Sequence, residues 1–315
     1  MNDVYTIGEL LIDFIPGSEE ASYIRKAGGA PGNVAIAVVK NGRTASMAFK
    51  VGDDDFGHFL VKTLKDYGVG VATPKLCKDA ITTCAFVSLA EDGERVFTFA
   101  RKPGADMLLD ESEILEEDIR DSAIVHAGSF SLSAGPAADA TRKALRLGHE
   151  LGSIVSFDVN YRNVVWNDDV DACVAAVKEI LPYVDLLKIS EEEVDMMGGI
   201  DAIPALMKDN GITMVMETLG SEGAQAFFGD EVIRVPGRKV KAVDATGAGD
   251  AFWGAFLASL RIQGVDKISD LTPEIIRKAM DYGTVSGCIC VQSKGAIASI
   301  PTRQQIEEYL AKEAR

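Results

Sequence analysis

The residues with the clearest chemical potential form the short stretch 247–250, Gly-Ala-Gly-Asp. It directly precedes a run in which Phe252, Phe256 and Leu260 recur every four residues, a spacing typical of a helix. Unpaired N–H groups and the dipole at a helix N-terminus attract anions, and small residues let an anion approach the backbone. An isolated Asp250 in this turn is usually only a cap or a favourable charge. Beside an anion site, however, a carboxylate suits phosphoryl transfer to a hydroxyl, because it accepts the hydroxyl proton.

A second glycine-rich stretch, GGAPGN at 28–33, also precedes a helical run, 34–39. One interpretation is a tight turn capped by Asn33. The other is that exposed backbone and the Asn33 amide bind a polyhydroxylated substrate. Asp13 follows an apolar strand pattern, and a carboxylate there can accept hydrogen bonds from two neighbouring hydroxyl groups.

Two other nucleotide-binding motifs can be tested directly against the sequence. The P-loop pattern G-x-x-x-x-G-K-[ST] does not occur. The dinucleotide pattern G-x-G-x-x-G fails as well, because Phe252 stands where its third glycine belongs after Gly247 and Gly249. Neither motif explains the glycine-dense stretch.

The elements that must position these residues alternate along the chain. Apolar, β-branched runs typical of strands buried on both faces alternate with helical patterns. This alternation predicts an α/β fold with a mostly parallel central sheet and helices on both faces. We expect strands at 4–10, 45–51, 124–127, 154–157, 186–189 and 212–216, and helices at 56–67, 136–151, 170–181, 273–291 and from about residue 302.

Two segments interrupt the alternation, at about 14–26 and 82–106. The second contains two strand patterns around Glu91, Asp92 and Gly93, a hairpin signal. The two segments either pair as one small β-sheet lid on the α/β body or form ordinary edge strands. A hairpin-like stretch precedes the glycine-dense stretch near the C-terminus, and no linker or repeat divides the chain. We therefore expect one domain over 1–315.

Composition and charge limit the possible partners. The 315 residues are 47% hydrophobic and 25% charged, enough for a substantial core. The formal net charge of −16 repels nucleic acid and acidic membranes, so we expect neither as a partner. No run of about 18 apolar residues and no signal peptide is present, which favours the cytoplasm. Five cysteines without CxxC spacing suit neither a disulfide framework nor a zinc site.

The motifs, taken in order, resemble those of the ribokinase-like sugar kinases, the PfkB family. The resemblance covers essentially the whole chain and implies a ribokinase-like fold and an ATP-dependent phosphotransferase with an alcohol group as acceptor. The stretches GELLIDFIP (8–16) and FTFARKPGADMLL (97–109) are most similar to fructokinases, which phosphorylate the 6-hydroxyl of D-fructose. The matching motifs are GGAPGNVAIAVVKNG (28–42), VGDDDFG (51–57), FDVNYR (157–162), KISEEE (188–193), ETLGSEGA (217–224) and DATGAGDAFWGAF (244–256).

Carried over position by position, the resemblance implies roles for the individual residues. Asp250 would be the catalytic base, and the amides of Gly247, Ala248 and Gly249 the anion hole. The sugar ligands would be Asp13, Gly28, Gly29 and Asn33, with Phe97 and Arg101 covering the sugar from the lid and Arg162 reaching toward substrate or phosphate. ATP would contact Lys188, Thr218, Gly220 and Gly223.

The resemblance also implies cations. Glu193 would help to organise Mg²⁺ through water, although Ser190 replaces the asparagine of the family's N-x-x-E pattern. A monovalent cation, expected to be K⁺, would lie beside the anion hole. Its mostly carbonyl ligands would come from Asp244, Thr246, Cys290, Ser293, Gly295 and Ser299.

Other functions are weighed on particular features. Within the same fold, a 2-keto-3-deoxygluconate kinase is the nearest alternative, because Arg101 and Arg162 suit its carboxylate. A non-catalytic sugar sensor is disfavoured because Asp250 stands in an intact TGAGD motif, and an oxidoreductase is disfavoured by the missing dinucleotide pattern. The resemblance further implies a homodimer formed through the lid, since an exposed sheet face favours cover.

Overall fold

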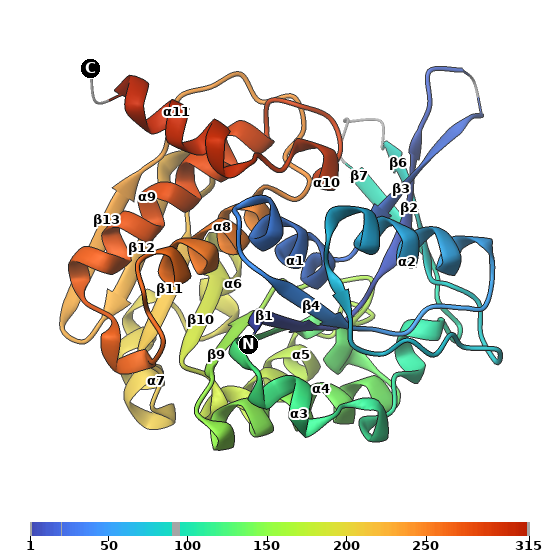
Figure 1. The fold of residues 1–315 in the computed structure, drawn as a ribbon, viewed down its shortest axis with the longest axis horizontal. Helices are drawn as coiled ribbons and strands as arrows, with labels where there is room; N and C mark the ends of the chain where they lie inside the picture. Colours follow the sequence, from blue (N-terminus) through green and yellow to red (C-terminus); the bar gives the residue numbers. More distant parts are fainter. Residues whose placement is uncertain (1, 20, 90–94, 314–315) are drawn as a thin grey trace.

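The computed structural model describes residues 2–19, 21–89 and 95–313, and its largest element is a nine-stranded sheet (Figure 1). The strand order is β13-β12-β11-β10-β9-β8-β1-β4-β5. All neighbours from β11 to β5 run parallel, and β12 pairs antiparallel with both β11 and β13. The mostly parallel sheet that the sequence predicts is therefore confirmed. Its strands are β1 (Asn2–Ile7), β4 (Ala45–Ala48), β5 (Gly70–Val71), β8 (Ser122–Gly128), β9 (Ile154–Asp158), β10 (Leu186–Ser190), β11 (Met214–Thr218), β12 (Gly223–Phe228) and β13 (Glu231–Pro236).

Helices cover both faces of this sheet, because the strands β1, β4, β8, β9, β10 and β11 each present apolar side chains on both sides. One core cluster packs α1, α2, α8 and α9 on one face, and another packs α3 to α7 on the other. Figure 1 shows α3, α4 and α5 together on the face away from α1 and α2. The helices are α1 (Ala30–Lys40), α2 (Asp55–Tyr67), α3 (Glu116–Arg120), α4 (Pro136–Leu151), α5 (Val170–Ile180), α6 (Glu191–Met196), α7 (Ile203–Asn210), α8 (Ala248–Ile262), α9 (Pro273–Cys290), α10 (Ala296–Ser299) and α11 (Arg303–Glu313).

The two interrupting segments pair as one small sheet in the order β3-β2-β6-β7, which we call the lid. Its strands are β2 (Leu11–Pro16), β3 (Tyr23–Gly28), β6 (Cys84–Leu89) and β7 (Arg95–Ala100). Strand β2 runs parallel to β6, which joins parts of the chain about seventy residues apart. The expected turn at Glu91, Asp92 and Gly93 lies outside the described residues. Figure 1 shows the lid beside α1 and α2.

Helix α8 is buried along most of its length and packs against the central sheet. Trp253 and Phe256 are fully buried, and Trp253 Nε1 donates to Ser156 Oγ on β9 at 2.9 Å. Helix α1 lies so close to α8 that a Cβ atom on Gly254 would stand 2.5 Å from Ala37 Cβ. Glycine at position 254 is therefore required for the two helices to pack this closely. The same packing brings the N-terminal turns of α1 and α8 together. Among the described residues, no helix is long and apolar enough to cross a membrane.

Candidate active site

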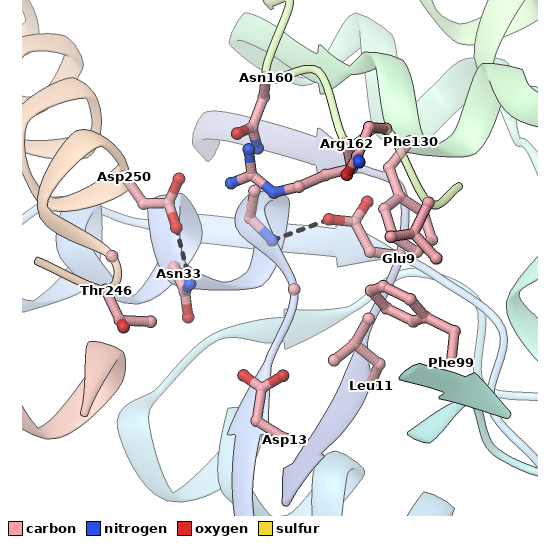
Figure 2. A pocket seen from close by; sticks show the side chains of 15 residues that line it. Glu9, Leu11, Asp13, Asn33, Phe99, Phe130, Asn160, Arg162, Thr246 and Asp250 are labelled. Carbon is pink, nitrogen blue, oxygen red and sulfur yellow. Dashed lines mark hydrogen bonds between the residues drawn. The ribbon is translucent and has the colours of Figure 1, made fainter. Parts of the chain in front are cut away.

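A cavity lies where the carboxyl ends of β1 and β9 meet the first turns of α1 and α8 (Figure 2). Ligands of open α/β sheets bind outside the carboxyl ends of the strands, so this is the expected position for a site. The lid closes one side through β2 and β7. The side chains that Figure 2 labels around it are Glu9, Leu11, Asp13, Asn33, Phe99, Phe130, Asn160, Arg162, Thr246 and Asp250.

The glycine-dense stretch forms the N-terminus of α8, as the sequence predicts. Gly247 is the residue before the first helical turn and has a left-handed backbone with φ of 76°. A Cβ atom there would also lie 2.5 Å from Ala296 Cβ, so both conformation and space require glycine. The first backbone N–H groups of α8 have no carbonyl of an earlier helical turn to bond. That of Ala248 donates instead to the carbonyl of Ala245 at 3.1 Å.

Asp250 is the third residue of α8, and its side chain is buried at the cavity wall. Its Oδ2 accepts a hydrogen bond from Asn33 Nδ2 at 2.7 Å, which Figure 2 shows as a bridge between α8 and α1. Burial raises the pKa of the Asp250 carboxyl; the hydrogen bond from Asn33 opposes the rise, and nearby Asp158 adds to it. A carboxylate whose pKa is raised in this way is a better proton acceptor than an exposed aspartate.

The other glycine-rich stretch opens α1 four residues earlier than the helical pattern suggests. Gly29 has φ of 113° and precedes the helix, and Pro31 falls in its first turn, where no N–H is needed. The interpretation of Asn33 as a cap is therefore wrong: Asn33 lies inside the first turn and contacts Asp250 instead. Gly28 packs against Asp13, since a Cβ atom there would overlap Asp13 Oδ2. Gly29, Asn33 and Asp13 all line the cavity.

Arg162, expected to reach toward substrate or phosphate, and Arg101 and Phe97, expected to cover the sugar, have different positions. Arg162 lines the cavity, is exposed, and donates from Nη1 to the carbonyl of Tyr161 at 2.9 Å. Arg101 donates to Asp106 at 2.7 Å and to Ser133 at 3.0 Å, and it is not among the residues that line the cavity. Phe97 belongs to β7, but its side chain lies outside the described residues.

Lys188 is buried beside the N-terminal turn of α8 rather than exposed on the surface. Its ammonium group donates to Asp158 Oδ2 at 2.8 Å, and both side chains are buried. A Cβ atom on Gly249 would lie only 3.6 Å from Lys188 Nζ. Burial opposes the charge, but the neighbouring carboxylates, Asp158 first, hold the pKa of Lys188 above its ordinary value. The ammonium group therefore lies beside the N-terminal turn of α8.

The remaining residues expected to contact ATP lie at the carboxyl end of β11 and in the turn that follows it. Thr218 is the last residue of that strand and donates to the carbonyl of Ile189. Gly220 and Gly223 have φ of 53° and 105°, and a Cβ atom on Gly223 would overlap the carbonyl of Val235. The backbone conformation of the turn between β11 and β12 therefore favours glycine at both positions.

Glu193, expected to organise Mg²⁺, is buried behind the site and held by two backbone N–H groups. Oε1 accepts from Tyr161 at 2.7 Å and Oε2 from Ser190 at 2.8 Å, while Ser190 Oγ caps α6 in return. Ser190, which stands where the family pattern has asparagine, therefore acts as the N-cap of α6. Each oxygen keeps a second lone pair, so the carboxylate fits a contact to Mg²⁺ through water.

The residues expected to hold a monovalent cation come together around the loop after α9. Asp244 accepts from the N–H groups of Thr246 at 2.9 Å and Gly295 at 3.0 Å. Cys290 Sγ lies 4.0 Å from the carbonyl of Thr246. Ser299 Oγ is buried without a hydrogen-bond partner among the described residues, so it is an oxygen that a cation would satisfy. Ser293 belongs to the same loop, and its N–H bonds the carbonyl of Cys290.

Sequence reasoning missed several residues of this site, among them Glu9, Phe130 and Asp158. Glu9 and Phe130 line the cavity, and Asp158 pairs with Lys188 below it. A single acidic residue inside the apolar run 7–12 was the available signal for Glu9. Phe130 carried no signal in the sequence, and it follows β8 in the short 3-10 helix Ser129–Ser133. No cluster of three or more histidine, cysteine or carboxylate ligands that could hold a metal occurs in the part of the chain that the structure describes.

The fold and the site define a class: a phosphotransferase with a helix N-terminus for the phosphoryl group, a buried carboxylate beside it and a cavity lined with hydrogen-bonding groups. A family model described as pfkB family carbohydrate kinase matches residues 1–303. The chain belongs to this family.

Individual relatives extend over the whole chain. It is 37% identical to the probable fructokinase-5 of Arabidopsis thaliana, covering 99% of this chain and 98% of that protein. A fructokinase of Vibrio cholerae O395, solved with fructose, ADP and calcium ion, superposes with a TM-score of 0.88 at 32% identity and covers 98% of this chain and 99% of its own. A fructokinase of Xylella fastidiosa with bound ATP gives 0.91 at 27% identity, with complete coverage of both chains.

Proposed function

We propose that this protein is an ATP-dependent fructokinase that transfers the γ-phosphoryl group of ATP to O6 of D-fructose. The observation that carries the proposal is the contact between Asn33 and Asp250, which unites the two glycine-rich turns at one cavity. Full-length similarity to plant and bacterial fructokinases supports fructose as the acceptor.

In the proposed reaction, Asp250 accepts the proton of O6 while that oxygen forms its bond to the γ-phosphorus and the bond to ADP breaks. The amides of Gly247, Ala248 and Gly249 stabilise the charge on the transferring group, and Lys188 below them adds to the field. Asp13, Gly28, Gly29 and Asn33 hold the sugar hydroxyl groups. Phe97 and Arg101 would cover the sugar from the lid, and Arg162, in the segment after β9, would reach toward the sugar or the phosphate.

The nucleotide is assigned to the side of α8 that faces β10 and β11, where Lys188, Thr218, Gly220 and Gly223 contact it. Bound Mg²⁺ would neutralise charge on the phosphates during transfer, and Glu193 would hold its water ligands. K⁺ would be bound by the loop of Asp244, Thr246, Cys290, Ser293, Gly295 and Ser299, for which the unpartnered Ser299 Oγ is the support.

The test is an acceptor panel with Mg-ATP, followed by ADP release, with and without K⁺. We expect D-fructose to give the highest kcat/KM and 2-keto-3-deoxygluconate to react poorly. Conversion of the product by glucose-6-phosphate isomerase and glucose-6-phosphate dehydrogenase identifies phosphorylation at O6. A higher kcat/KM for the sugar acid, or fructose binding without ADP release, would overturn the proposal.

The proposal includes a homodimer formed through the lid in the cytoplasm. One support is the aromatic cluster of the lid: Phe14 stacks on Phe86 at 4.9 Å, while Tyr23 remains 49% exposed. Five free, buried cysteines suit a reducing compartment. Sedimentation of the wild type and of Tyr23→Lys tests the dimer, which we expect the lysine to dissociate. A wild-type monomer at micromolar concentration would contradict it.

A further inference from the structure

Glu9 is a buried carboxyl group in the cavity that the proposed reaction does not use. It lies in the short connection between β1 and β2 and is 4% exposed. Its Oε1 accepts from the N–H of Ala30, the first residue of α1, at 2.9 Å. Its Oε2 is buried and has no hydrogen-bond partner among the residues that the structure describes. Buried polar atoms without a partner are rare and indicate a missing ligand or water.

Figure 2 shows how this carboxyl group is placed. The bond to Ala30 fixes one oxygen, and the second oxygen points toward the side of the cavity that holds Phe130 and Arg162. Phe99, Phe130 and Leu11 provide an apolar wall on this side. The carboxyl group therefore faces the cavity on the side away from Asp250.

The surroundings favour the protonated form of Glu9. Burial, and then the charges of Asp106 and Asp250, raise the pKa of Glu9 to about 8, although the N–H of Ala30 opposes the rise. A neutral carboxyl group carries one O–H donor, unlike a carboxylate. The charged groups on the surrounding elements are Asp13 on β2, Asp106 with its partner Arg101, Arg162 after β9, and Asp250 on α8.

We propose that Glu9 is a specificity-determining residue whose Oε2–H donates a hydrogen bond to an oxygen of the bound sugar. The inference rests on the proposed function, because it requires the sugar to occupy this cavity. Ala30 accounts for the acceptor Oε1, so the orientation of the donor is fixed before the sugar binds. An acceptor molecule without an oxygen at this position leaves the buried O–H unpaired and is rejected.

The experiment compares wild type, Glu9→Gln and Glu9→Leu from pH 6 to 9.5. In the wild type, we expect the KM for fructose to rise with pH through about 8, because the O–H donor is lost on ionisation. The amide of Glu9→Gln keeps a donor at every pH, so its KM should lose this rise. Glu9→Leu should raise the fructose KM about tenfold or more while the KM for ATP stays unchanged.

The control is Glu217→Gln, a buried carboxyl group on β11 that bonds Gln225 and does not line the cavity. It should keep the wild-type pH profile. A Glu9→Gln profile identical to that of the wild type would overturn the inference, even if Glu9→Leu fails to fold. Such a result leaves fructose turnover by the wild type intact, whereas a wild type without sugar turnover would refute the proposed function itself.

Discussion

The paired substitutions Gly247→Ala and Gly249→Ala separate the two demands on the α8 turn, which are its backbone conformation and its access for an anion. At Gly247, a left-handed φ of 76° costs alanine about 1 to 2 kcal/mol. Its methyl group would lie 2.5 Å from Ala296 Cβ, and such overpacking costs about 1 to 3 kcal/mol more. We therefore expect Gly247→Ala to lower the free energy of unfolding by about 2 to 5 kcal/mol.

Gly249 differs because it lies within the helix, and the nearest atom to an added methyl group is Lys188 Nζ at 3.6 Å. Alanine there should leave stability unchanged or raise it by about 0.5 to 1 kcal/mol, since glycine weakens a helix. The methyl group nevertheless stands between the phosphoryl site and Lys188, so we expect kcat/KM to fall about tenfold.

Urea unfolding and initial rates of ADP release measure both variants. Gly247→Ala with wild-type stability would refute the conformational argument. Gly249→Ala with wild-type kcat/KM would refute the assignment of this turn as the anion site, because its fold is expected to remain intact.

Three further predictions concern the charges around this turn. Asp250→Asn should lower kcat about 10² to 10⁴ fold, and wild-type turnover in this variant would contradict the role of Asp250 as the base. In the wild type, log kcat/KM should fall as the pH falls through a pKa above that of an ordinary aspartate. Lys188→Met should cost about 3 to 5 kcal/mol in urea unfolding by leaving Asp158 uncompensated, with a smaller loss in Lys188→Met/Asp158→Leu; equal losses in both variants would argue against the pair. Ser299→Ala should raise the K⁺ concentration for half-maximal activation about fivefold, and an unchanged K⁺ titration would remove Ser299 from the cation site.

The sequence predicts the central sheet because its strands are buried on both faces and therefore continuously apolar. The strand at 154–157 is found at Ile154–Asp158, whereas the one expected at 212–216 is displaced to Met214–Thr218. The lid is harder to predict, since β3 exposes Tyr23, Ile24 and Arg25 and so lacks a clean alternation. The pairing of β2 with β6 depends on contacts between distant segments that no local pattern encodes.

The candidate site is predictable where chemistry depends on local backbone, as at Gly247 and Asp250. It is not predictable where a side chain acts through a distant partner. Asn33 has the features of a cap in the sequence, and only the packing of α1 on α8 reveals its bond to Asp250. Lys188 resembles a nucleotide contact, and only the parallel pairing of β9 with β10 places it against Asp158.

The bond between Asn33 and Asp250 spans 217 positions of the chain, and this distance has a consequence for biosynthesis. A ribosome releases the N-terminal segment first, so α1 emerges long before α8 exists to cover it. Until then, the surface of α1 around Ala37 that Gly254 fits lacks its neighbour and is open to aggregation or to chaperones. The catalytic carboxylate assigned to Asp250 thus becomes available only when the final quarter of the polypeptide has been synthesised and α8 packs against α1.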